Sequence, residues 1–200
     1  MLVQALALGA LASIGLALRR SRARAASCED PVTGLAGVRA FHDALATCLA
    51  EGGPQTETFA VLVLSVCRYD RLRRELGRSA LEELVSDLAE RMRRRVGAED
   101  LCARLDDSVL AVLLSKNHGA LRAPEVAHYV AGRIELVTLI GRRVAVDVNS
   151  IIVIGWPGGS LQVMDSVMSD AESSLSRTTR LHGDGVLATE LIGERRRRAS

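Results

Sequence analysis

The sequence predicts an α/β fold in which helices flank a central, mainly antiparallel sheet. A continuous apolar run from Phe59 to Val66 has the length and β-branched content of a buried strand, and segments of helical periodicity lie before and after it. Two apolar arms, 103–105 and 109–114, enclose the polar turn 106–108, which indicates a β-hairpin. Strands separated by helices, with one hairpin among them, are typical of a ferredoxin-like sandwich.

The first half of the domain is predicted to alternate helix and strand. Apolar side chains recur at helical spacing, and Gly or Gly-Pro punctuation ends the first two helices. Ser79 and Glu82 have the spacing of a capping box, so we expect a third helix to begin there. In chain order the expected elements are a helix, a strand and two helices, over residues 38–49, 59–66, 68–76 and 79–96.

The second half starts with the hairpin and ends with a short strand. Pro124 suits the first turn of a helix, and apolar residues recur at helical spacing from Val126 to Val137, so we expect a helix as far as Ile140. An alternating and then apolar segment predicts a strand that Gly155 to Gly159 closes. After the hairpin we therefore expect a helix, a strand, a helix and a strand, over residues 124–140, 144–154, 161–181 and 185–189.

The N-terminus carries an apolar segment, Leu2 to Leu18, at the short end of the lengths that span a bilayer. Because basic residues follow the apolar segment rather than precede it, the positive-inside rule predicts a single-pass signal anchor in the inner cell membrane, with the C-terminal domain in the cytoplasm. An interfacial helix or a misassigned start codon are the alternatives. The basic residues gather in two terminal clusters, Arg19, Arg20, Arg22 and Arg24, and Arg195 to Arg198. The predicted organisation is an anchor, a basic juxtamembrane linker, one domain and a basic tail, over residues 1–18, 19–29, 30–190 and 191–200.

Composition excludes two classes of function. Aromatic residues make up only 2% of the chain, which argues against a nucleic-acid partner because single-stranded nucleic acids stack on aromatic faces. The four cysteines form no Cys-x-x-Cys pair and have no His at ligand spacing, so we expect neither a zinc site nor a disulfide framework.

Two segments of the sequence carry recognisable motifs. The stretch Asp30-Pro31-Val32-Thr33-Gly34-Leu35, followed by Arg39 and Phe41, resembles D-x-L-T-G-L-x-N-R-R-x-F, the entry motif of GGDEF domains in the diguanylate cyclase family. The hairpin from Ala103 to Leu114 resembles A-R-L-(G-G-D-E-F)-A-V-L-L. The bracketed motif falls on a remnant turn, Asp106, Asp107, Ser108, Val109 and Leu110. The resemblance extends from about Asp30 to Thr189 and implies a nucleotide-cyclase sandwich of GGDEF type.

In that family, two GTP-loaded domains meet face to face and make cyclic di-GMP. The resemblance implies two divalent metals, held by an Asp at the end of the first strand and an acidic residue in the turn. Here Ser65 occupies the strand-end position and Cys67 the place of a second Asp. Since a hydroxyl and a thiol are poor ligands for hard cations, we expect no metal and no cofactor.

The remaining positions also depart from the family pattern. Arg73 falls on the Asn that reads guanine, whereas Glu82 keeps the acidic character of the residue that assists it. By the same resemblance Arg180 corresponds to a phosphate-contacting Lys, if a one-turn insertion is allowed. The product-binding R-x-x-D motif keeps Asp100 but has Gly97 in place of its Arg.

Acidic and basic side chains in these segments also have structural interpretations. Asp106 and Asp107 could share one metal, but a solvated hairpin turn is favoured because Asp is a common turn residue. A capping-box role is favoured for Glu82. For the arginines of segment 68–78, a solvated helix face is favoured over an anion site.

These observations predict a degenerate, catalytically inactive GGDEF domain, held at the cytoplasmic face of the membrane by residues 2–18 and the Arg clusters. Such a domain would act as a scaffold or signalling module that binds a protein partner or forms a homodimer. One alternative is a divergent diguanylate cyclase that uses Mg²⁺ with Asp106 or Asp107. The other is a sensor that binds GTP or cyclic di-GMP without turnover.

Overall fold

A computed structural model describes most of the predicted domain. The described residues are 29–50, 58–115, 119–137, 143–156 and 186–189, together with positions 158, 162, 166, 168–170 and 175. The predicted membrane anchor, most of the basic linker and the basic tail lie outside these residues. Within the described ranges, none of the helices combines the length and the hydropathy needed to cross a bilayer.

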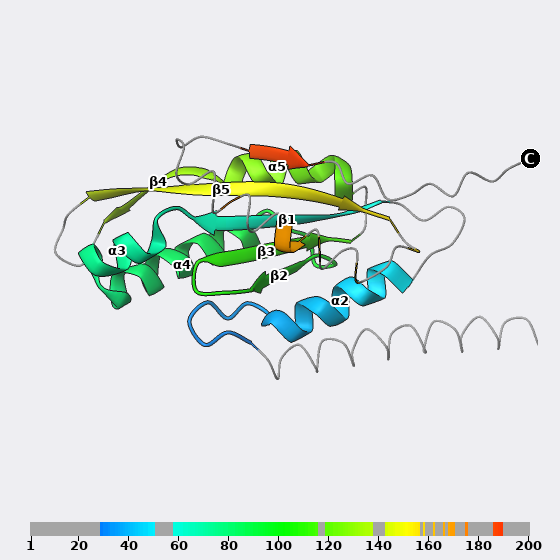
Figure 1. Cartoon of the computed structure of the whole chain (residues 1–200), viewed down its shortest axis with the longest axis horizontal. Helices are drawn as coiled ribbons and strands as arrows, with labels where there is room; N and C mark the ends of the chain where they lie inside the picture. The colour runs from blue at the N-terminus through cyan, green and yellow to red at the C-terminus, as the bar shows by residue number, and fades with distance from the viewer. Residues whose placement is uncertain are drawn as a thin grey trace, which may run out of the picture.

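Helices and strands alternate along the chain with one hairpin, β2–β3, among them (Figure 1). The helices are α2 (Val38–Ala50), α3 (Tyr69–Leu76), α4 (Arg78–Arg93) and α5 (Gly119–Val130). The strands are β1 (Phe59–Val66), β2 (Leu101–Arg104), β3 (Val109–Leu114), β4 (Gly132–Val137), β5 (Arg143–Gly155) and β6 (Val186–Thr189).

The sheet has the order β2-β3-β1-β5-β4, with antiparallel neighbours throughout this path. Strand β5 is 13 residues long, and two strands share one of its edges. Its first half pairs with β4, whereas residues 150–153 pair in parallel with β6. Because β3 lies between β1 and β2 and is antiparallel to both, β1 and β2 run parallel, as a ferredoxin-like sandwich requires. The predicted fold class is therefore confirmed.

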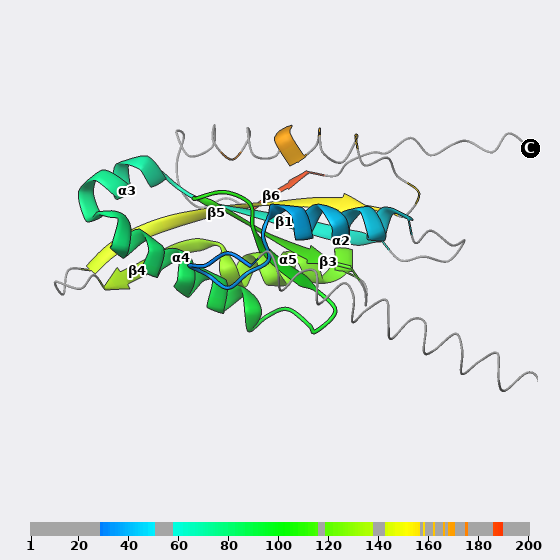
Figure 2. The ribbon, with the colours of Figure 1, turned by 90° about the horizontal axis from the view of Figure 1, so that it is seen from below.

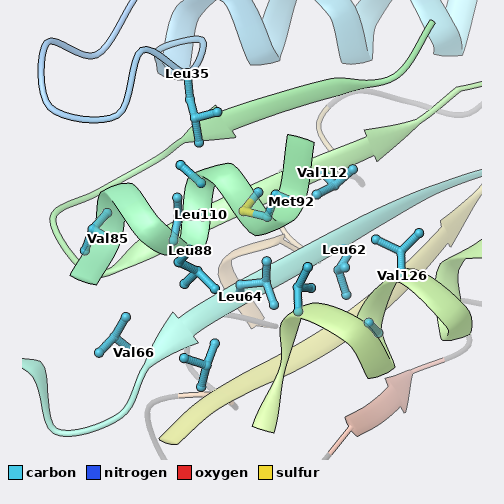
Figure 3. Close-up of a cluster of buried hydrophobic side chains, with 14 of the residues drawn as sticks. Leu35, Leu62, Leu64, Val66, Val85, Leu88, Met92, Leu110, Val112 and Val126 are labelled. Carbon is cyan, nitrogen blue, oxygen red and sulfur yellow. The ribbon is translucent and has the colours of Figure 1, made fainter. Parts of the chain in front are cut away.

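Two hydrophobic clusters pack against opposite faces of the sheet, because successive residues of a strand point to opposite sides. One cluster joins Leu62 and Leu64 of β1 to Leu88 of α4 and Val126 of α5 (Figure 3). The other joins the alternate β1 residues to α2. All eight residues of β1 are buried, which explains its unbroken apolar sequence. Helix α3 differs, since none of its residues is fully buried and it protrudes at one end of the molecule (Figures 1 and 2).

The structure corrects the predicted helix over residues 124–140. Helix α5 begins at Gly119, so that Pro124 lies inside it, and it ends at Val130. Residues Gly132–Val137 form strand β4 instead, paired with the start of β5. Gly132 has a φ of 103°, which allows the chain to leave the helix and reverse.

The predicted capping box is also wrong. Helix α4 begins at Arg78, one residue earlier than expected, and its N-cap is Gly77, so Ser79 lies inside the first turn and is not the capping residue. Glu82 accepts a hydrogen bond of 2.6 Å from Arg78 Nε. The predicted helix over 161–181 lies mostly outside the described residues, but the described positions within that range are helical.

Candidate functional site

The site is built where three segments meet: the entry turn at residues 30–35, the C-terminal end of β1, and the β2–β3 hairpin turn at residues 106–108. In the entry turn, the Asp30 carboxylate accepts hydrogen bonds of 2.8 Å from both the backbone N–H and the hydroxyl of Thr33. The Thr33 hydroxyl in turn accepts the Leu35 N–H at 3.2 Å. Gly34 has a φ of 63°, a left-handed conformation that favours glycine. The entry turn therefore has glycine at the position whose backbone conformation favours it, and Asp30 and Thr33 stabilise the turn by hydrogen bonds.

Arg104 at the end of β2 joins the entry turn to the hairpin turn through its side chain. Its side chain is only 8% exposed, and Nη1 donates to both Asp30 carboxylate oxygens at 3.1 and 3.2 Å. Its other nitrogens donate to the backbone carbonyls of Asp106 at 3.2 Å and Asp107 at 3.0 Å. A buried guanidinium needs this many acceptors, because an unpaired charge in the interior is costly. One side chain thus fixes two segments that lie far apart in the sequence.

The hairpin turn is anchored to the end of β1. The Val66 N–H donates to the Ser108 carbonyl at 3.0 Å, and Ser65 lies opposite Val109 on one side and Asn149 of β5 on the other. Ser65 is only 9% exposed. The turn therefore lies where the resemblance places the family's metal site, with a buried hydroxyl at the strand-end position.

One carboxylate of the turn, that of Asp107, faces two arginines of the same chain. Asp107 lies 3.6 Å from Arg73 Nη1 of α3 and 3.8 Å from Arg104 Nη2. Asp106 is exposed, and its carboxylate accepts the backbone N–H of Asp107 at 2.7 Å. Burial raises the pKa of the nearby Tyr69 phenol, and the Asp107 charge raises it further. The turn is consequently a local charge network, and Asp107 is its shared anion.

The entry carboxylate is held in its ionised form. Burial alone would raise the pKa of Asp30, but the hydrogen bonds from Thr33 and the guanidinium of Arg104 outweigh it, so the pKa lies below its ordinary value. Asp30 therefore has a structural role, because its negative charge is paired with Thr33 and Arg104 of the same chain.

The donor set at the end of β1 does not fit the divalent cations that the family resemblance implies. Ser65 offers a hydroxyl, and burial together with the Asp147 charge raises the pKa of the Cys67 thiol, which keeps it protonated. Hard cations take carboxylate and carbonyl oxygens. Among the described residues, no group of three or more His, Cys, Asp or Glu side chains could hold a metal ion.

Most of the residues singled out in the sequence lie near the turn, and the structure gives contacts for several of them. Arg73 contacts the turn, Glu82 pairs with Arg78 at the start of α4, and Arg180 lies outside the described residues. Asp100 accepts the Gly97 N–H and pairs with Arg122 of α5 at 2.7 Å, so it anchors a loop.

Sequence reasoning missed the Asp30–Arg104 pair. An arginine inside an apolar strand was the signal for it. Sequence reasoning also did not single out Asn149, which lies opposite Ser65 at the end of β1. Its buried Nδ2 has no hydrogen-bond partner among the described residues.

Comparisons with known proteins agree with the fold. The model of the family described as "Diguanylate cyclase, GGDEF domain" matches residues 27–183. No match is found among curated proteins.

Among solved structures, the GGDEF domain of YfiN (also called TpbB) from Pseudomonas aeruginosa is 22% identical, with a TM-score of 0.68, covering 80% of this chain and 99% of that one. The GGDEF domain of FimX from Pseudomonas aeruginosa is 21% identical, with a TM-score of 0.65, covering 82% of this chain and 98% of that one. The GGDEF domain of DgcB from Caulobacter crescentus, in complex with cyclic di-GMP, is 22% identical, with a TM-score of 0.66, covering 81% of this chain and 93% of that one. Since the family model matches well over half of the chain, the protein belongs to the GGDEF domain family and is related to the diguanylate cyclases.

Proposed function

We propose that this chain is a GGDEF domain that makes no cyclic di-GMP and acts instead as a protein-interaction module at the cytoplasmic face of the membrane. The observation that carries the proposal is the set of contacts made by the hairpin turn at residues 106–108. Its carboxylate Asp107 faces Arg73 and Arg104, and the strand-end position beside it is the buried Ser65.

Phosphoryl transfer of the kind the family performs depends on metal ions that neutralise triphosphate charge. A cation entering this turn would have to displace two guanidinium groups from Asp107, and Ser65 would supply no second carboxylate. Asp106 and Asp107 also stand where the family has glycines, so they add negative charge where phosphates would approach. Loss of catalysis follows from both effects.

An interaction role is supported by what remains intact. Among the described residues the sheet, the entry turn and both hydrophobic clusters are in place, so the chain keeps a folded framework that a partner could bind. The diguanylate cyclase SiaD from Pseudomonas aeruginosa, 16% identical with a TM-score of 0.65, was solved in complex with its activator SiaC, and covers 94% of this chain and 73% of its own. A protein partner or a second copy of this chain is therefore the ligand that we propose.

Incubation of the full chain in non-ionic detergent with GTP and Mg²⁺ or Mn²⁺ tests the loss of activity. We expect no cyclic di-GMP above a no-protein blank by mass spectrometry, while an active diguanylate cyclase in the same detergent gives product. Calorimetric titration with GTP and with cyclic di-GMP should show no saturable heat. Measurable product that disappears on Asp107→Ala would establish the divergent cyclase instead.

Membrane attachment has its own test. The full chain should sediment with membranes and resist extraction by high salt, whereas a chain lacking residues 2–18 should be released by salt, because only the Arg clusters would then hold it. Equal extraction of both chains would contradict the anchor.

A further inference from the structure

We propose that the outer edge of strand β4 is an interface through which two copies of this chain pair, strand against strand, into one continuous sheet. In the proposed dimer the two β4 strands run antiparallel about a two-fold axis at Ile134. The inference names the surface and the partner of the interaction module, and it therefore rests on the proposed function.

Strand β4 leaves one edge of the sheet open. It is the last strand of the sheet path, and among the described residues it pairs only with β5 (Figure 2). All six of its residues pair in register with β5, so the strand contains no bulge, and it contains no proline. At the opposite edge, Ala36 lies as an outer neighbour beside Ala103 of β2. A regular, uncovered edge strand is a template for a further strand.

The helices leave room for a second chain beside β4. Helix α5 has its main contacts with β1, β3 and β5, and α4 has its main contacts with α3, α5 and β2. Neither helix has its main contacts with β4. A two-fold axis perpendicular to the sheet would place the helices of both copies on the same face, each set beneath its own central strands.

The hydrogen bonds of β5 show which backbone groups of β4 point outward. The Cys67 N–H donates to the Asp147 carbonyl at 2.9 Å, so Asp147 directs its backbone groups toward β1. In an antiparallel pair, the N–H and C=O groups of one residue point to the same side and successive residues alternate. Val146 therefore directs its groups toward β4, where it pairs with Ile134. The backbone groups of both neighbours of Ile134 consequently point away from the sheet.

The sequence around Ile134 is complementary to itself, which favours a second copy of this chain as the partner. With the two-fold axis at Ile134, Arg133 of each copy is opposite Glu135 of the other, and unlike charges directly opposite stabilise a strand pair. Moving the axis by one residue would place two copies of Glu135 opposite each other, which is destabilising. Within the chain, Arg133 is opposite Asp147, a carboxylate that Arg68 already contacts at 3.6 Å.

This register also satisfies the outward backbone groups. Positions 133 and 135 form hydrogen-bonded pairs across the axis, and each such pair exchanges two backbone hydrogen bonds. The dimer therefore gains four backbone hydrogen bonds from groups that otherwise face solvent. Glu135 is exposed, so its side chain can meet the second copy without any rearrangement of the core.

The first test removes one outward N–H. Sedimentation equilibrium of the full chain in density-matched non-ionic detergent measures the dimer Kd. Glu135→Pro deletes the N–H at position 135 and keeps the bonds between β4 and β5, because an edge strand accepts proline where the N–H faces outward. Glu135→Gln is the matched control, since it removes the charge and keeps the N–H. We expect the Kd of Glu135→Pro to exceed that of Glu135→Gln at least tenfold, because each dimer loses two backbone hydrogen bonds.

The second test exchanges charges across the axis and does not depend on the proline variant. Glu135→Arg and Arg133→Glu should each weaken self-association, because like charges then face each other. An equimolar mixture of these two variants, one of them carrying a fluorescent tag, should form mixed dimers with a Kd within about threefold of the wild-type value. High salt should reduce this rescue.

Three results would overturn the proposal. They are a wild-type chain that stays monomeric up to about 100 μM, a dimer whose Kd is the same in Glu135→Pro and Glu135→Gln, and a mixture without rescue. A monomeric chain that binds an extended peptide of another protein would likewise exclude the second copy as the partner. None of these results depends on cyclic di-GMP synthesis, so this inference and the proposed loss of activity fail separately.

Discussion

Removing the Asp30 carboxylate should destabilise the domain by about 3 kcal/mol, at the lower end of the range for breaking a buried ion pair. The carboxylate accepts hydrogen bonds from Thr33 N–H, the Thr33 hydroxyl and Arg104. In Asp30→Ala, the Arg104 guanidinium stays buried with two backbone carbonyls as acceptors and with the exposed Asp107 carboxylate 3.8 Å away. These two acceptors, together with the partial exposure of Asp30, set the estimate at the lower end of that range.

Urea unfolding of the full chain in non-ionic detergent measures this effect. Trp156 is the single tryptophan and directly follows β5, so its fluorescence reports on loss of the sheet. Asp30→Asn should cost less, about 1–2 kcal/mol, because the amide oxygen still accepts from Thr33 while the charge is lost. Asp43→Ala, which removes an exposed carboxylate from α2, is the control and should stay within about 0.5 kcal/mol of wild type. The reasoning is refuted if Asp30→Ala unfolds at the same urea midpoint as this control.

Three further outcomes follow. The pKa of Asp30 is lower in the folded chain than its unfolded value of about 4, so the stability that its charge contributes should be complete above that pH. This contribution should disappear as the pH falls through the lowered pKa of the folded state. In urea titrations at acid pH, the difference in unfolding free energy between wild type and Asp30→Asn should therefore narrow. Gly34→Ala should destabilise by about 1–2 kcal/mol in the same assay, because φ is 63° and an added Cβ would lie 3.0 Å from Arg93 Nη2; an unchanged midpoint would contradict this. Burial raises the pKa of the Cys102 thiol to about 12, so iodoacetamide at pH 8 should label Cys102 only after unfolding, as peptide mass spectrometry can show; rapid labelling of the native chain would count against it.

The central strands could be predicted because complete burial leaves a direct trace in the sequence. The predicted strand over 59–66 coincides with β1, and the predicted strand over 144–154 differs from β5 by one residue at each end. Strand β1 lies at the centre of the sheet between two layers, so neither of its faces needs polar residues. Strand β5 is partly exposed over residues 143–147 and buried over residues 148–153, which matches its alternating and then apolar sequence.

Strand β4 could not be separated from the helix before it by periodicity. Ile134 continues the helical spacing of Val126 and Val130, so one apolar pattern extends across the end of α5. Ile134 is buried and Glu135 exposed, which also fits the alternation of an edge strand. Gly132, in a left-handed conformation, marks the boundary, and giving glycine more weight as a helix terminator would have ended the helix correctly.

The candidate site was partly predictable. The resemblance located the turn and Arg73, but the ion pair that fixes the turn joins residues 74 positions apart, and no local pattern encodes such a contact. Departures from the family pattern at Ser65 and Cys67 could be read from residue types alone, and the expectation of no metal stays a prediction. That Arg73 faces Asp107 depends on where α3 lies relative to the turn, and only the structure supplies that.

The entry segment also covers one edge of the sheet that other chains could otherwise pair with. Strand β2 is outermost in the sheet order, and an unpaired outer strand is a template for joining strands of other molecules. Ala36 covers it: its N–H donates to the Cys102 carbonyl at 3.1 Å, and its carbonyl accepts the Arg104 N–H at 2.8 Å. The segment around Ala36 therefore occupies hydrogen-bonding groups of β2, which reduces edge-to-edge pairing with other molecules. Damage to the entry turn would accordingly appear first as insoluble protein and only later as lost secondary structure.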